Sequence, residues 1–493
     1  MTSSHEFPRS APEAQGISSS EISRFVDALE ATERPLEGVH SMMLLRHGNV
    51  IAEGWWSPYQ ANANHMMFSV SKSYCSTAIG LAVAEGLLSV DDQVLAFFPD
   101  EAPADPSPNI QAMRVRHLLS MNTGHHEDTT GAVFAAGDES WARVFLSLPV
   151  EHEPGTWFVY NTGATYMLSA IITRLTGESL LEYLRPRLFE PLGITHPTWD
   201  TDPRGISIGG SGLHIRTEDI ARLGQLYLQD GRWGETELLA PAWVAEATSV
   251  HSDNSNTQTN PDWTVGYGYQ FWRCRHNAYR GDGAFGQFCL VMPDQNAVLA
   301  ITSGLMDMQA VLDKVWDILL PAFEEVVLPA DPAAARALQD KLESLVMRQP
   351  VSSGRHADPE TWSGKRWVLN ANPLGVDSVA LTPRDGDVVV SLEGQAGDQE
   401  VLAGTGTWQT GAIRLPDPRS GLIDLTRDAG EPVAASGAWS APNTYDLWLA
   451  FTNGVYGQAW RFDMDGDRLT LTIEPNVSWG DGAPLIVEGH LDT

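Results

Sequence analysis

The spacing of hydrophobic and polar positions predicts an ordered chain after a polar start. Residues 1–20 are polar and rich in proline and serine, which is typical of an extended lead-in. The segment Ser18–Ala31 shows helical spacing after serine caps, and His40–Trp56 predicts two strands around an Arg-His-Gly-Asn turn. The segment Ser69–Leu88 is rich in small and apolar residues and is too long for a strand, so it predicts a nearly buried helix.

Helical patterns dominate the next part of the chain. They recur at Val115–Met121, Trp141–Leu148, Thr165–Leu175, Ser179–Leu188, Thr217–Asp230 and Pro241–Thr248. Two apolar segments near Tyr267–Cys274 and Gly286–Gly304 then predict strands, and Met308–Phe323 predicts a closing helix. Strands, many helices, strands and a helix in this order predict an α+β fold, with an antiparallel sheet flanked by helices.

The pattern changes again near residue 325. Residues 326–360 predict a linker with a short helix, and residues 361–493 contain short alternating segments separated by turn residues such as Asp-Gly-Asp. We therefore expect an N-terminal domain over 1–325 and a β-rich C-terminal domain over 361–493. The C-terminal domain should be an antiparallel sandwich or barrel.

The net charge and composition of the chain narrow the classes of partner that it can bind. The 493 residues carry 63 acidic and 31 basic side chains, a formal net charge of −32, which disfavours binding to nucleic acid or an anionic membrane. The N-terminus lacks an apolar signal region and the three cysteines are far apart, so we expect a cytoplasmic location. The sequence indicates no cofactor and no metal, because the adjacent residues His125–Asp128 rarely converge on one ion.

Lysine usage singles out one residue. The chain has four lysines, and Lys72 stands alone among the first 313 residues. It follows Ser69 by three positions, which places both side chains on one face at the start of the predicted helix. A desolvated lysine can accept the proton of a serine hydroxyl and so activate it as a nucleophile. The alternative is a polar helix start with Ser69 as its cap.

Two later segments add candidate groups. Tyr160 follows a Pro-Gly turn and precedes Asn161, Thr162 and a predicted helix, so its hydroxyl can project into a cleft. A nearby cation would lower the pKa of Tyr160 and let it act as a base. Glycines around Gly283–Phe285 precede an apolar strand and would allow a backbone N–H to approach a ligand closely.

Together these motifs resemble the serine β-lactamase and penicillin-binding-protein superfamily, most of all its class C, peptidase S12-like hydrolases and esterases. The resemblance covers roughly residues 10–325, in the order Ser-x-x-Lys, Tyr motif and glycine-containing strand. It implies Ser69 as the acylated nucleophile and Lys72 and Tyr160 as its proton-transfer partners. It also implies an oxyanion hole from the Ser69 N–H and one N–H of Gly283, Ala284 or Phe285. The C-terminal part resembles lipocalin-like domains of some relatives.

The chain departs from the family pattern at two places. Tyr-x-Asn appears as Tyr160-Asn161-Thr162, so either Asn161 or Thr162 would contact the substrate. The usual Lys-Thr-Gly or His-x-Gly is replaced around Arg280–Gly283, and Arg280 would have to substitute for the lysine that binds a β-lactam carboxylate.

The resulting hypothesis is a serine hydrolase that cleaves an amide or ester of a small molecule or peptide through an acyl-enzyme on Ser69. It would be an esterase, an amidase or a D-amino-acid peptidase, and a homo-oligomer is possible. β-Lactamase and acyl-transferase activity are the alternatives within this class. A penicillin-binding or sensor protein that is acylated without turnover is the alternative outside it.

Overall fold

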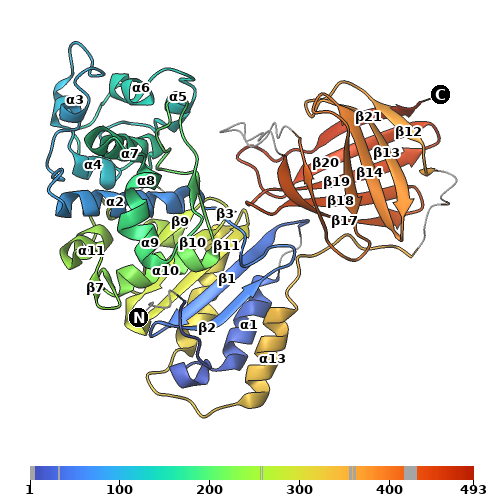
Figure 1. Cartoon of the computed structure of the whole chain (residues 1–493), viewed down its shortest axis with the longest axis horizontal. Helices are drawn as coiled ribbons and strands as arrows, with labels where there is room; N and C mark the ends of the chain where they lie inside the picture. The colour runs from blue at the N-terminus through green and yellow to red at the C-terminus, as the bar shows by residue number, and fades with distance from the viewer. Residues whose placement is uncertain are drawn as a thin grey trace.

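The computed structural model describes residues 6–31, 34–255, 257, 259–354, 358, 362–415 and 430–492. A six-stranded antiparallel sheet forms the centre of the N-terminal part (Figure 1). Its strands, in spatial order, are β2 (Asn49–Trp55), β1 (Gly38–Arg46), β11 (Ala297–Gly304), β10 (Gln287–Met292), β9 (Tyr279–Gly283) and β8 (Trp272–Arg273). The predicted hairpin is therefore confirmed as β1 and β2, and β1 also pairs with β11 from the far end of this segment.

Helices cover both faces of this sheet, as predicted. Ser41 of β1 contacts Thr217 at the start of α10 (Thr217–Leu228). On the opposite face, Gly54 of β2 approaches Leu342 of α13 (Pro332–Glu343), which packs on α1 (Ser19–Leu29). Because both faces are covered, β1 is buried at every position, including the polar residues His40, Ser41 and Arg46.

A helical layer rises above one end of the sheet (Figure 1). Its helices are α2 (Ser71–Ala84), α3 (Pro108–Ala112), α4 (Val115–Leu119), α5 (Thr130–Phe134), α6 (Trp141–Ser147), α7 (Thr162–Thr176), α8 (Leu180–Leu184), α9 (Glu190–Leu192) and α11 (Pro241–Thr248). Helix α12 (Met308–Lys314) returns to the sheet after β11. Helix α2 packs on α7 and is buried along nearly its whole length, as its small and apolar sequence predicts.

Short elements connect these layers. The helical turns are η1 (Glu13–Gln15), η2 (Phe68–Val70), η3 (Val94–Phe97), η4 (Arg185–Phe189), η5 (Pro261–Trp263), η6 (Pro293–Gln295), η7 (Val315–Leu319) and η8 (Leu320–Ala322). The small sheets are β3 (His65–Met66) with β5 (Leu213–Ile215) and β4 (Thr198–Trp199), and β6 (Arg232–Trp233) with β7 (Thr236–Glu237). Strand β3 leads directly into η2.

The C-terminal part is a ten-stranded, all-antiparallel sheet that curls into a nearly closed barrel, which confirms the predicted β-rich fold. Its strands are β12 (Arg366–Leu369), β13 (Val376–Arg384), β14 (Asp387–Gly394), β15 (Gln399–Ala403), β16 (Gln409–Ile413), β17 (Glu431–Ala441), β18 (Thr444–Phe451), β19 (Gly457–Asp465), β20 (Arg468–Pro475) and β21 (Leu485–Leu491). Burial alternates along β18 and β20, so one set of side chains fills the barrel.

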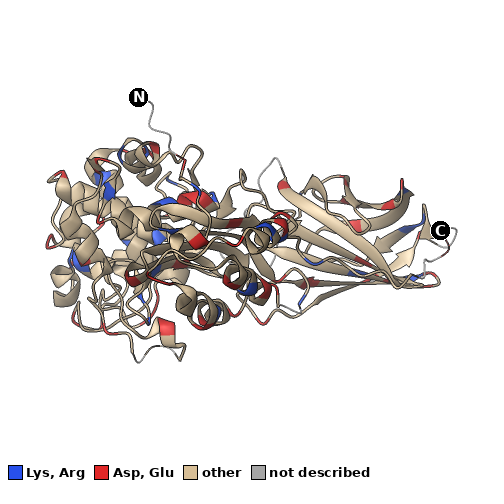
Figure 2. Ribbon diagram, turned by 90° about the horizontal axis from the view of Figure 1, so that it is seen from below, with Lys and Arg blue, Asp and Glu red and all other residues tan. Residues whose placement is uncertain are grey.

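Two large hydrophobic cores match these two parts. One core extends from Phe7 to Met347 and includes Leu338 of α13 and Leu345, so part of the predicted linker packs on the N-terminal core. The other lies inside the barrel and includes Trp367 and Trp460. Acidic residues occur along the ribbon of both parts (Figure 2), in keeping with the net charge of −32.

Candidate active site

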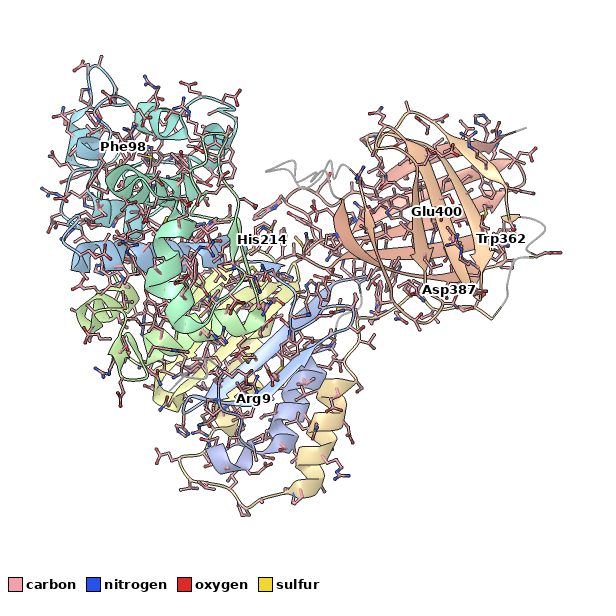
Figure 3. The ribbon with its side chains drawn as sticks, viewed as in Figure 1. Arg9, Phe98, His214, Trp362, Asp387 and Glu400 are labelled. Atoms are coloured by element: carbon pink, nitrogen blue, oxygen red, sulfur yellow. The ribbon has the colours of Figure 1, made fainter. Side chains whose placement is uncertain are left out.

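Ser69 and Lys72 meet where β3 passes into the helical layer. Ser69 lies in the 3-10 turn η2, and Lys72 is the second residue of α2, so the helix proper begins two residues later than predicted. The backbone stays in the right-handed helical region at Val70 and Ser71, which keeps the two side chains on one face. Strand β5 pairs with β3, and its His214 lies between the helical layer and the barrel in Figure 3.

The Lys72 amine is buried and makes three hydrogen-bond contacts. Its Nζ lies 2.9 Å from Ser69 Oγ, 3.0 Å from Thr162 Oγ1 and 2.7 Å from the Gly210 carbonyl oxygen. The side chain is 1% exposed. Burial lowers the pKa of Lys72 to about 7, although the carboxylates of Asp128 and Asp282 act in the opposite direction. A substantial fraction of the amine is therefore neutral at pH 7.

Tyr160 faces the same pair of residues. Its ring lies under Lys72, with Nζ 4.9 Å from the ring centroid, and stacks on Trp272 at 5.1 Å. Its hydroxyl forms a hydrogen bond with Ser69. Burial, followed by the nearby charge of Asp282, raises the pKa of Tyr160 far above its usual value. The sequence-based expectation of a lowered pKa is wrong in direction, because these two effects outweigh the nearby cation.

Asn161 and Thr162 have separate contacts. Asn161 is the N-cap of α7, and its Oδ1 accepts hydrogen bonds from Ala164 N and from Thr129 Oγ1 at 2.7 Å. Thr162 is half-buried and directs its hydroxyl to Lys72. A Cβ atom on the next residue, Gly163, would lie 2.1 Å from Thr129 Oγ1, so this turn requires glycine. The sequence left open whether Asn161 or Thr162 would contact the substrate. Of these two residues, Thr162 is the one in contact with Lys72.

The end of β9, next to the start of α2, forms a wall of the candidate site. A Cβ on Gly281 would lie 2.5 Å from Ser73 Oγ, and one on Gly283 would lie 2.2 Å from the Met67 carbonyl oxygen. These glycines allow β9 to approach the start of α2 closely. Ala284 is half-buried, whereas Gly283 and Phe285 are buried. Gln287 Nε2 donates to the Ala284 carbonyl oxygen at 3.0 Å and fixes the orientation of this turn.

Arg280 and Asp282 form a buried ion pair behind this wall. Arg280 is 0% exposed, and its Nε donates to Asp282 Oδ2 at 3.0 Å. Its Nη1 donates to the Asp262 carbonyl oxygen at 2.7 Å, and the guanidinium stacks over Trp263 at 4.1 Å. Burial raises the pKa of Asp282 although Arg280 opposes this. Arg280 is the residue that would have to bind a substrate carboxylate in place of the family lysine. In the structure it is enclosed by other groups of the protein.

Sequence reasoning missed Gly210 as a site residue. Its carbonyl oxygen accepts from Lys72, and a Cβ at this position would lie 2.5 Å from Thr162 Cγ2. Ser71 Oγ accepts from Leu213 N at 3.2 Å and ties the segment after Gly210 to α2. The only sequence signal was the glycine-rich run Gly209–Gly212, which does not reveal a contact with a residue so distant in the chain.

The histidine-rich segment before α5 is divided between different surroundings. His125 is buried and contacts Thr123, while the exposed His126 contacts His152. Within the described residues, no group of three His, Cys, Asp or Glu side chains is arranged to hold a metal ion. In the same part of the chain, none of the helices is both long and apolar enough to cross a membrane.

Comparisons with known proteins identify the family of the N-terminal part. The family model described as Beta-lactamase matches residues 29–319, more than half of the chain. The chain is 25% identical over 289 residues to 6-aminohexanoate-dimer hydrolase of Paenarthrobacter ureafaciens, which covers 54% of this chain and 73% of that protein.

Two solved structures are similar in fold. EstCE1, a hydrolase with promiscuous acyltransferase activity, has a TM-score of 0.52 and 19% identity, covering 60% of this chain and 99% of that chain. A penicillin-binding protein homologue from Caulobacter crescentus has a TM-score of 0.52 and 17% identity, covering 64% of this chain and 100% of that chain. With the family match, these findings show that the chain belongs to the beta-lactamase family of serine hydrolases.

Proposed function

We propose that this protein cleaves an ester or amide through an acyl-enzyme on Ser69. The observation that carries the proposal is the 2.9 Å contact between the Ser69 hydroxyl and a buried lysine whose pKa is lowered to about 7. A serine hydroxyl needs a base to become a competent nucleophile, and a neutral amine at this distance supplies one. Ser69 is itself half-buried, so a substrate carbonyl can reach it.

The three contacts of Lys72 suit its neutral form. A neutral amine has two N–H donors and one lone pair. The donors match the Gly210 carbonyl and the Thr162 hydroxyl, and the lone pair then accepts the proton of Ser69. The Ser69 oxygen attacks the substrate carbonyl carbon as Lys72 takes its proton, which gives a tetrahedral oxyanion and a lysine ammonium.

Tyr160 acts as the acid in the next step. Its raised pKa keeps the phenol protonated, so it can donate its proton to the leaving oxygen or nitrogen as the C–O or C–N bond breaks. The Lys72 ammonium then returns a proton to Tyr160. In deacylation, water attacks the acyl carbon and loses its proton to the same pair of residues, and Ser69 regains its hydroxyl hydrogen.

The backbone N–H groups of Ser69 and Ala284 would stabilise the oxyanion. Of the three residues in the predicted Gly283–Phe285 wall, Ala284 is the half-buried one, which favours it as the second donor.

The charges around the site favour substrates that lack a carboxylate beside the scissile bond. Arg280 is enclosed by Asp282, Asp262 and Trp263, while Asp282 and Asp128 act electrostatically on Lys72. A β-lactam or a C-terminal D-amino acid would bring a carboxylate to a site whose arginine, Arg280, is already paired with Asp282. Simple esters and amides would avoid this cost.

Intact-mass analysis with a fluorophosphonate probe tests the proposal. We expect one adduct on the wild type and none on Ser69→Ala, together with steady release of p-nitrophenol from p-nitrophenyl acetate. A stoichiometric burst without steady release would instead support an acylated sensor. Product that partitions to an added amine would indicate acyl transfer, for which the similarity to EstCE1 is the supporting observation. Labelling that persists in Ser69→Ala would exclude Ser69 as the nucleophile.

A further inference from the structure

A third hydrophobic cluster lies between the two large cores and beside Ser69. Its buried members are Met66, Phe68, Phe285, Val455 and Val477. Phe68 directly precedes Ser69 and Phe285 directly follows Ala284, whereas the two valines belong to loops of the barrel. Ala284 and Tyr456 pack against the same cluster. Residues of the barrel therefore contact both segments that carry the proposed nucleophile and oxyanion hole.

Two barrel aromatics cover this cluster. The ring of Trp479 lies 4.9 Å from that of Phe285 and 6.0 Å from that of Phe68, measured between centroids. The ring of Tyr456 lies 6.1 Å and 6.2 Å from the same two rings. The Trp479 indole N–H donates to the Tyr456 hydroxyl at 3.3 Å, which fixes the two aromatics relative to each other.

The backbone beneath them is strained. Phe68 and Phe285 adopt φ angles of 45° and 64°, in the left-handed region that bulky residues rarely enter. Such strain costs on the order of 1–3 kcal/mol and persists only where the surrounding packing enforces it. The two phenylalanine rings contact each other at 5.7 Å and both contact Trp479, so the barrel aromatics are part of the packing that holds this geometry.

Hydrogen bonds hold the barrel loops against the N-terminal part. Met66 N donates to the Asn453 carbonyl oxygen at 2.8 Å. Asn476 Nδ2 donates to the Leu36 carbonyl oxygen at 3.2 Å and to the Val455 carbonyl oxygen at 2.8 Å. In Figure 1 the barrel accordingly lies beside the end of the sheet near β3. The barrel loops thus have a fixed position next to the site.

Trp479 also differs from the tryptophans inside the barrel. Trp362, Trp367, Trp439 and Trp460 are at most 6% exposed and fill the barrel core. Trp479 is 49% exposed. A half-exposed indole that packs on Phe68, the residue before Ser69, is suited to contact an apolar group of a bound substrate.

We propose that Trp479 and Tyr456 of the barrel complete the substrate site and select esters or amides that carry an apolar alkyl or aryl group next to the scissile bond. This inference rests on the proposed hydrolase function. The N-terminal part provides the reacting groups, and the barrel provides one wall for the substrate. A neutral apolar group suits this wall, because Arg280 is already paired with Asp282.

Two series of esters test the proposal in the full chain. In one series the leaving group is p-nitrophenol and the acyl group is acetyl, butyryl or octanoyl. In the other the acyl group is acetyl and the alcohol part is methyl or naphthyl. We expect Trp479→Ala to raise KM about tenfold for the bulkier member of at least one series. The same variant should change KM for p-nitrophenyl acetate less than twofold. Trp479→Phe should restore much of the preference.

Ile486→Ala is the matched control, because Ile486 is an apolar barrel residue that is 59% exposed. It should leave both series unchanged. Equal loss across all esters in Trp479→Ala, or no loss in either series, would overturn the proposal while leaving the hydrolase function intact.

Binding provides a readout that does not depend on turnover. In Ser69→Ala, the Kd for p-nitrophenyl octanoate should rise about tenfold when Trp479→Ala is added. An unchanged Kd would overturn the proposal even if the wild type proved unable to hydrolyse esters. Failure of the wild type to react with fluorophosphonate would instead contradict the proposed function.

Discussion

The Lys72 Nζ atom lies 2.9 Å from Ser69 Oγ and is held from its other sides by Thr162 Oγ1 and the Gly210 carbonyl oxygen. Three segments that are distant in sequence therefore fix one amine against one hydroxyl. Burial of this amine lowers its pKa to about 7, which places its change of charge in the physiological range. The following predictions depend on this arrangement and its surroundings.

The rate of acylation should rise with pH around the pKa of Lys72. The amine accepts the Ser69 proton only when neutral, so kcat/KM for ester hydrolysis should increase through about pH 7 and then level off. Lys72→Ala should reduce the rate at least about 100-fold. A pH series of fluorophosphonate labelling rates measures both effects. Lys365→Ala is the control, and a flat profile from pH 5 to 9 would contradict the role of Lys72.

Removal of the Tyr160 hydroxyl should affect amides more than activated esters. A p-nitrophenolate leaves without a proton, whereas an amine must be protonated as the C–N bond breaks. Tyr160→Phe should lower the rate for an anilide about 100-fold and the rate for p-nitrophenyl acetate less than tenfold. Steady-state kinetics with both substrates tests this. Equal losses would contradict a role as leaving-group acid, and Tyr269→Phe provides a control.

A side chain at position 210 should disturb the site without unfolding the protein. The Cβ of Gly210→Ala would lie 2.5 Å from Thr162 Cγ2 and would displace the carbonyl oxygen that accepts from Lys72. We expect kcat to fall at least about tenfold, since small misplacements of catalytic groups are costly. Gly131→Ala is the matched control, because a Cβ there meets nothing within 4 Å. Wild-type kcat in Gly210→Ala would show that this contact is dispensable.

The fold should lose stability in mild acid. Burial lowers the pKa of His65 to about 4, and burial followed by the proximity of His65 lowers the pKa of His40 well below its usual value. Below about pH 6.5 the unfolded chain therefore binds more protons than the folded chain. The stability due to His65 is present above pH 6.5 and falls by roughly 3 kcal/mol as the pH drops to about 4.

Urea unfolding at pH 7.5 and pH 5 measures this dependence. His65→Gln should reduce the difference in unfolding free energy between the two pH values. The exposed His196 gives the control variant His196→Gln, which should retain the wild-type difference. A pH dependence that is identical in wild type and His65→Gln would exclude His65 as a source of the effect.

The local sequence pattern alone determined several structural features of this protein. The Ser69 and Lys72 spacing placed two groups on one helical face, and the turn in His40–Trp56 formed a hairpin, because both depend on contacts within a few residues. Period-two alternation after residue 361 likewise predicted the all-β part, since one face of each strand must be buried.

Only the tertiary structure decided which groups meet at the site and what their surroundings do to them. Gly210 reaches Lys72, Thr162 rather than Asn161 contacts it, and Asp282 encloses Arg280 through packing between distant segments. The direction of the Tyr160 pKa depends on burial that no local motif records. The same holds for Trp479, whose place beside Phe68 follows from the docking of the barrel loops against the sheet.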